Sequence, residues 1–174
     1  MKHILAYIFI FLSVGQMAAQ NFPQDWAGVW TGQMQIWQMN QVVTEFAMKL
    51  EISPTDSSWN YIITYKADSD TPDVRTYSLI SINDTIGHYG IDEHNSIVLD
   101  SYLIGNCLFT HFSGMQTDLQ TRVCMHGDHM EYEISYGPTK EVRQSGGTVI
   151  EQDTILSINS YAVTSLMKAS LKRE

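Results

Sequence analysis

Basic residues and long apolar runs are scarce in this sequence. Only 10 Lys and Arg stand against 19 Asp and Glu in 174 residues, which gives a formal net charge of -9. This imbalance argues against a nucleic acid or an anionic membrane surface as the main partner. Beyond the N-terminal segment, no apolar run reaches the length that a bilayer requires, so we expect no membrane insertion. Hydrophobic residues still make up 44% of the chain, enough to build the core of one ordinary domain.

Motifs for catalysis and for cofactors are also missing. The sequence has no Gly-x-Ser-x-Gly elbow, no phosphate-binding glycine loop, no Cys-x-x-Cys pair and no Asp-rich calcium loop. The consecutive residues 92–94, Asp-Glu-His, sit on an expected turn and cannot converge as a triad. His126 and His129 flank another expected turn, where they are either polar surface residues or, with Asp128 or Glu131, a divalent metal site. Because these two histidines supply only two nitrogens, we expect no metal site there. Because the motifs named above are missing, we also expect no cofactor and no catalytic residues.

The N-terminal segment has the features of a secretory signal peptide. A basic start at Lys2 precedes an apolar run from Ile4 to Val14, and small residues follow at Ala18 and Ala19. The run is too short to span a bilayer, so we expect cleavage near Ala19, with an uncleaved anchor as the alternative. We therefore predict a signal peptide over residues 1–19, one mature domain over residues 20–174, and a secreted or periplasmic location.

Alternation of apolar and polar residues with a period of two runs through most of the remaining chain. It is clearest over residues 42–53, where Phe46, Met48 and Leu50 share one face, as in a strand with one buried face. Further strands are expected over residues 58–67, 74–82, 85–91, 96–103, 148–159 and 162–171. At most one short helix is expected, near the start of the mature chain or over residues 139–147. About ten short strands joined by turns predict an all-β sandwich or barrel.

Two hairpins between residues 107 and 136 can be paired residue by residue. The turns at residues 114–117 and 127–128 set the two registers. In both, one face is apolar and the other is polar, as a half-buried sheet requires. The expected inward pairs are Leu108 with Val123, Phe112 with Leu119, Val123 with Tyr132, Met125 with Met130 and Thr121 with Ile134, while Arg122 meets Glu133 outside.

The same register places Cys107 directly opposite Cys124. In an exported protein these two cysteines are candidates for a disulfide, and two reduced thiols on neighbouring strands are the alternative. A reactive-thiol enzyme is disfavoured, because the nearby Glu131 and Glu133 would raise the pKa of a thiol rather than lower it.

The segment Asp25-Trp26-Ala27-Gly28-Val29-Trp30-Thr31-Gly32 resembles the Gly-x-Trp signature that begins the first strand of lipocalins and related calycin barrels. The resemblance implies that Trp30 plugs one end of the barrel and that Gly28 is a close-packed position before it. The chain is also similar to small exported proteins of Bacteroidota-type bacteria with lipocalin-like barrels. The resembling runs are residues 90–93, 95–100, 105–127, 130–134 and 160–172.

This resemblance decides between sandwich and barrel. It implies an antiparallel up-and-down β-barrel of about eight to ten strands. The chain lacks the Thr-Asp-Tyr run of the typical lipocalins, so receptor-type functions are not carried over. Nitrobindin-like barrels bind haem through a His near the C-terminus, whereas the last His here is His129, which counts against haem.

Three functional hypotheses follow. The first is a non-catalytic barrel that binds a small apolar or amphipathic molecule, such as a lipid or an aromatic metabolite. The second is an interaction or structural module of the cell envelope with a filled barrel, and the third is an enzyme that uses the barrel mouth.

His88, beside two glycines, is expected as a structural His, with an inward position as the alternative. The predicted interior residues are Trp30, Met34, Phe46, Met48, Tyr89, Phe112, Met125, Met130 and Tyr132.

Overall fold

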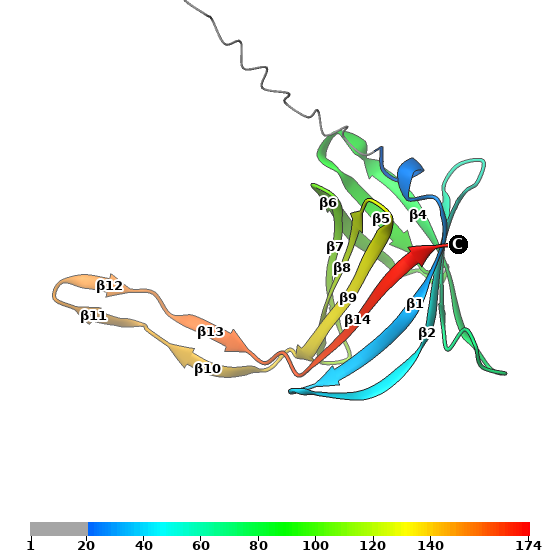
Figure 1. Ribbon diagram of the computed structural model, residues 1–174. Helices are drawn as coiled ribbons and strands as arrows, with labels where there is room; N and C mark the ends of the chain where they lie inside the picture. The colour runs from blue at the N-terminus through cyan, green and yellow to red at the C-terminus, as the bar shows by residue number, and fades with distance from the viewer. Residues whose placement is uncertain (1–20) are drawn as a thin grey trace, which may run out of the picture.

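A computed structural model describes residues 21–174, so the predicted signal segment over residues 1–19 lies outside the described residues (Figure 1). Ten antiparallel strands close into a barrel in the order β1-β14-β9-β8-β7-β6-β5-β4-β3-β2. The predicted all-β, up-and-down barrel is therefore confirmed. The barrel strands are β1 (Gly28–Gln38), β2 (Gln41–Pro54), β3 (Trp59–Tyr65), β4 (Asp73–Asn83), β5 (His88–Asp92), β6 (Val98–Ile104), β7 (Cys107–Gly114), β8 (Thr117–His126), β9 (His129–Pro138) and β14 (Ser165–Arg173).

Two short 3-10 helices complete the barrel. The first, η1 (Gln24–Trp26), precedes β1 and lies in one of the two regions where a short helix was expected. The second, η2 (Asp84–Ile86), lies between β4 and β5. The strand expected over residues 85–91 therefore begins later, at His88, because residues 84–86 form a turn that Gly87 ends with a positive φ of 67°. In residues 21–174 no helix is long and apolar enough to cross a membrane.

The first helix and the start of β1 close one end of the barrel. Trp26 and Trp30 have no exposed surface, and the indole Nε1 of Trp30 donates a hydrogen bond of 2.9 Å to the carbonyl of Trp26. The guanidinium of Arg173 lies 4.5 Å above the Trp30 ring and also donates a 2.7 Å bond to the carbonyl of Asp25. A side chain at Gly28, where φ is +142°, would meet Arg173. Trp30 is therefore fully buried and held by contacts to η1 and to the end of β14, while its role as a lipocalin-type plug stays a prediction.

The two predicted hairpin registers are confirmed. β7 and β8 pair Leu108 with Val123 and Phe112 with Leu119, and they place Cys107 opposite Cys124. β8 and β9 pair Met125 with Met130, Val123 with Tyr132 and Thr121 with Ile134. Inward residues of both hairpins, including Met125, Met130 and Tyr132, are buried in the core. A single choice of inner face therefore holds over three adjacent strands.

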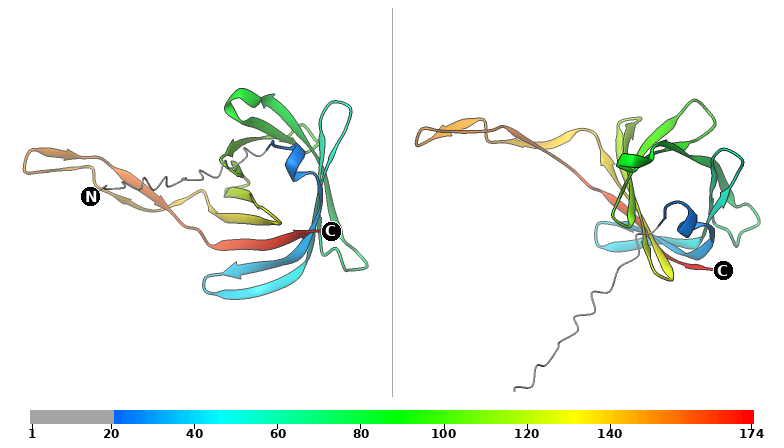
Figure 2. Two further views of the ribbon diagram at one scale, coloured as in Figure 1. Left: turned by 45° about the horizontal axis from the view of Figure 1, so that its top comes forward. Right: turned by 90° about the horizontal axis from the view of Figure 1, so that it is seen from above.

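Residues 139–164 differ from the prediction. They form neither a helix nor a strand of the barrel. They make a two-stranded ribbon, here called the arm, which leaves the barrel after β9 and returns to β14. Figures 1 and 2 show the arm standing away from the barrel in all three views. Its strands are β10 (Glu141–Ser145), β11 (Thr148–Ile150), β12 (Asp153–Ile155) and β13 (Ile158–Tyr161), with β10 paired to β13 and β11 to β12.

The arm corrects two expectations about the C-terminal region. The strand expected over residues 148–159 is instead a hairpin tip, turned at Glu151 and Gln152, whose φ angles of 49° and 80° suit a two-residue hairpin turn. The last strand begins at Ser165 rather than at Ala162. Met167, Ala169 and Leu171 of this strand face the core.

Candidate functional site: the barrel cavity

A cavity of about 520 Å³ lies inside the barrel, toward the end opposite the tryptophan plug. Lys66 and Asp73, which flank the β3–β4 turn, contribute to its lining. The wall is built from inward positions of most of the barrel strands, so the alternation read from the sequence generates it directly. The apolar lining residues are Phe46, Ile63, Ile91, Leu99, Leu108, Phe112, Leu119, Val123, Ile134 and Met167.

Four tyrosines bring hydroxyl groups into this apolar space. Tyr61, Tyr65, Tyr77 and Tyr132 all line the cavity. Burial, and secondarily the neighbouring Tyr65, raises the pKa of Tyr61 far above its ordinary value. Burial likewise raises the pKa of Tyr132, with further contributions from Tyr65 and Tyr61. These phenols therefore stay neutral at physiological pH and offer hydrogen bonds without charge.

The rim of the cavity carries charges that compensate one another. Arg75 donates two hydrogen bonds to Asp73, of 2.8 Å and 2.9 Å, and this contact lowers the pKa of the Asp73 carboxyl. Lys66 and Glu93 add one further charge of each sign to the lining. The cavity thus has two cationic and two anionic groups at its mouth and only neutral groups below them.

The nine predicted interior residues separate into two groups. Phe46, Phe112 and Tyr132 line the cavity. The other six are buried in the packed core and are not among the cavity-lining residues: Trp30, Met34, Met48, Tyr89, Met125 and Met130. Tyr89 packs edge-on against Phe22, next to the plug, with ring centroids 4.8 Å apart.

Sequence reasoning missed several residues of the cavity. Tyr61 and Tyr65 follow the same period-two pattern as Ile63, which was the available signal. Arg75 and Tyr77 lie on β4, where the alternation is looser, and inward-facing charge at a barrel mouth has no local sequence signature.

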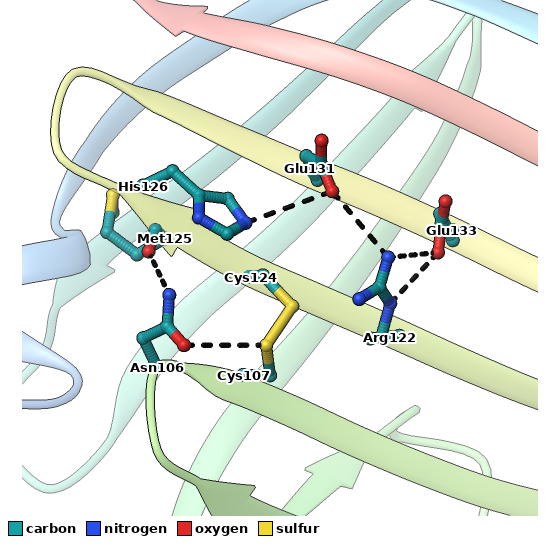
Figure 3. Close-up of a disulfide and its surroundings, with 8 residues drawn as sticks. All are labelled: Asn106, Cys107, Arg122, Cys124, Met125, His126, Glu131 and Glu133. Atoms are coloured by element: carbon teal, nitrogen blue, oxygen red, sulfur yellow. Dashed lines mark hydrogen bonds and ion pairs between the residues drawn. A yellow bond between two sulfur atoms is a disulfide. The ribbon is translucent and has the colours of Figure 1, made fainter.

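The disulfide predicted as one of two alternatives is present between Cys107 and Cys124, with sulfur atoms 2.06 Å apart. Figure 3 shows it beside Asn106, whose Nδ2 donates a 2.6 Å bond to the carbonyl of Met125. Such a bond indicates an oxidising compartment, which agrees with the coarser part of the localisation prediction. Finer assignment to secretion or the periplasm stays a prediction.

A cluster of charges lies on the same outer face. Arg122 donates a hydrogen bond of 2.9 Å to Glu133 and forms an ion pair with Glu131 at 3.6 Å. Figure 3 shows both contacts of Arg122. Lys168, on the neighbouring strand, lies 3.1 Å from Glu133. Burial raises the pKa of Glu133, but its hydrogen bonds to Arg122 and Lys168 outweigh this, and the net effect lowers it. The predicted outward pairing of Arg122 with Glu133 is confirmed.

None of the histidines in residues 21–174 lines the cavity. His88 faces outward, stacks on Tyr102 at 4.6 Å and contacts Asp100 at 2.7 Å, so its inward alternative is wrong. His126 and His129 stack across their turn with centroids 5.3 Å apart. Among the residues that the structure describes, no three His, Cys, Asp or Glu side chains gather closely enough to hold a metal ion.

Comparison with known proteins gives no assignment. No protein-family model matches the chain, and no curated protein matches it significantly.

Proposed function

We propose that this barrel binds one small, uncharged, largely apolar molecule and does not catalyse a reaction. The observation that carries the proposal is the cavity of about 520 Å³, which has mainly aliphatic and aromatic walls. That volume falls in the range of small-molecule sites. A filled barrel acting only through its outer surface would need no such space, so the cavity favours the binding hypothesis over the filled module.

The charges of the site restrict the ligand. Arg75 already donates two hydrogen bonds to Asp73. A ligand carboxylate would therefore have to compete with the Asp73 carboxylate for Arg75. Below the rim only phenol and threonine hydroxyls are available, and burying an unpaired charge there is costly. The favoured ligand has an aromatic or aliphatic body and one or two neutral polar groups that reach the tyrosines.

Two matched fluorescent probes test this proposal. N-phenylnaphthylamine is neutral, and anilinonaphthalene sulfonate has the same ring system with one anionic group. We expect saturable, one-to-one binding of the neutral probe, at least about tenfold tighter than that of the sulfonate. Absence of saturable binding of the neutral probe would overturn the proposal, and equal binding of both would overturn the restriction on charge.

Variants locate the binding site. Thr121 and Ile134 face each other across β8 and β9 and both line the cavity. Their joint replacement, Thr121→Trp with Ile134→Trp, fills roughly a third of the space and should weaken the neutral probe at least about tenfold. The control is Thr76→Trp with Val74→Trp, two exposed positions on β4. Binding that survives the inner pair, or that is lost equally in both, would place the probe elsewhere.

A further inference from the structure

Exposed large hydrophobic side chains are more frequent per residue on the arm than on the rest of the described chain, where twelve are spread over 128 residues. Eight large hydrophobic side chains of residues 139–164 are exposed, from Ile155 at 38% to Leu156 at 74%. No residue of β10, β11, β12 or β13 is buried. An isolated two-stranded ribbon is at best marginally stable in water, and exposed apolar clusters of this kind mark interaction sites. The arm therefore needs a partner that the barrel of the same chain does not supply.

The two edges of the arm are chemically different. The outgoing edge carries Lys140, Glu141 and Arg143, the charged residues with which proteins protect exposed strands from pairing. The returning edge, residues 154–164, reads Thr-Ile-Leu-Ser-Ile-Asn-Ser-Tyr-Ala-Val-Thr and contains no charge, no proline and no glycine. Such a sequence favours addition of another strand. The returning edge is thus the open one.

We propose that β13 pairs antiparallel with β13 of a second copy of this chain, so that two arms form a four-stranded sheet. In a symmetric antiparallel pair one residue lies opposite itself on the two-fold axis. With Asn159 on that axis, Ile155 lies opposite Val163 and Leu156 opposite Ala162. Every position from 154 to 164 then has an uncharged partner.

Charge distribution also fits a second copy. The arm carries two basic and three acidic residues, so its net charge is -1 and a charge of -8 lies elsewhere in the chain. In the antiparallel arrangement the two acidic barrels lie at opposite ends of the paired arms. Residues 154–164 comprise the end of β12, all of β13 and the residues beside them, and this segment spans about 36 Å when fully extended in the pair, several times the screening length at physiological salt. Repulsion between the barrels is therefore small.

A groove at the base of the arm offers room for the tip of the partner's arm. It has a volume of about 450 Å³ and is bounded by Tyr136, Tyr161 and Val163 together with outward residues of β7 and β8. The proposed register brings Ile155 and Leu156 of the second copy to this end of the ribbon. A lipid bilayer is a poorer partner, because unpaired strand edges are excluded from hydrocarbon and the arm tip bears Glu151 and Asp153.

The oligomeric state of charged variants tests the proposal. Ile158→Lys places a charge on the open edge, and Val142→Lys places one on the protected edge at a similarly exposed position, 64% against 56%. By light scattering at about 100 µM, we expect a dimer for the wild type and for Val142→Lys, and a monomer for Ile158→Lys. A monomeric wild type would overturn the proposal. So would loss of the dimer in both variants or in neither.

Chemical cross-linking tests the proposed register, which the oligomeric state alone does not report. Asn159→Cys, treated with a short bismaleimide linker, should give a covalent dimer, because residue 159 lies opposite itself. The matched variant Val142→Cys should not cross-link, because the outgoing strands lie on the outer edges of the four-stranded sheet. Failure of Asn159→Cys to cross-link, or equal linking of both variants, would contradict the proposed pairing.

Discussion

Reduction of the Cys107–Cys124 disulfide should destabilise the barrel by an amount that can be calculated. The bond joins residues separated by 17 positions. Loss of a loop constraint of this size stabilises the unfolded chain by about 3 kcal/mol in the chain-entropy account. β7 and β8 are also paired along their whole length, so we expect the folded barrel to persist after reduction.

Urea unfolding with and without a phosphine reductant measures this effect. With a urea dependence of about 2 kcal/mol per molar, the midpoint should fall by about 1.5 M on reduction. The variant Cys107→Ala with Cys124→Ala is the control, because its midpoint should not respond to reductant. An unchanged wild-type midpoint, together with a mass gain of about 2 Da that confirms reduction, would refute the reasoning.

Ionisable side chains give two further predictions. Because burial raises the pKa of Tyr61 and Tyr132, their contribution to stability is present below pH 10.0 and is lost above it, by up to about 1.4 kcal/mol per pH unit for each group. Above pH 10.0, the free energy of unfolding should therefore fall less steeply with pH in Tyr132→Phe than in the wild type. Because Arg122 and Lys168 lower the pKa of Glu133, its contribution of about 0.5 to 1 kcal/mol is present near pH 7 and is lost as the pH falls below 4.5. Glu133→Gln should thus be destabilising at pH 7 and nearly neutral at pH 3.

Both predictions have matched controls on the arm. Tyr161 is exposed, so Tyr161→Phe should leave the alkaline slope unchanged. Glu151 is exposed at the arm tip, and Glu151→Gln should unfold like the wild type at both acidic and neutral pH. Parallel alkaline curves for Tyr132→Phe and the wild type, or a pH-independent effect of Glu133→Gln, would contradict the respective assignments.

The hairpins of the barrel were predictable because their constraints are local. A tight turn at residues 127–128 leaves one register, and a shift by one residue would have placed Arg122 and Glu133 inside. Cys107 could be placed opposite Cys124 for the same reason. The plug at Trp30 followed from a resemblance and not from any pattern of the residues themselves.

The arm was not predictable from the same patterns. Residues 148–159 contain Val149, Ile150, Ile155 and Leu156, which read as a strand bound for the core. Whether such a strand enters a barrel or an exposed ribbon depends on pairing with distant residues, here β10 with β13. Local alternation contains no information about that choice.

Cavity and core could not be separated for a similar reason. Phe46 and Met48 are neighbours on the inner face of β2, yet Phe46 lines the cavity and Met48 is buried in the packed core. The position of a residue along the barrel axis depends on the stagger of all ten strands. This stagger cannot be read from the sequence of one strand. The sequence therefore indicates which residues face inward but not which of them meet a ligand.

A crystal structure of the protein with N-phenylnaphthylamine would show whether the barrel interior is the binding site. We expect density for one probe molecule inside the barrel, in contact with Phe46 and Ile134 and with its amine near a tyrosine hydroxyl. An interior closed by rearranged side chains, or a probe bound only on the outer surface or the arm, would contradict this expectation.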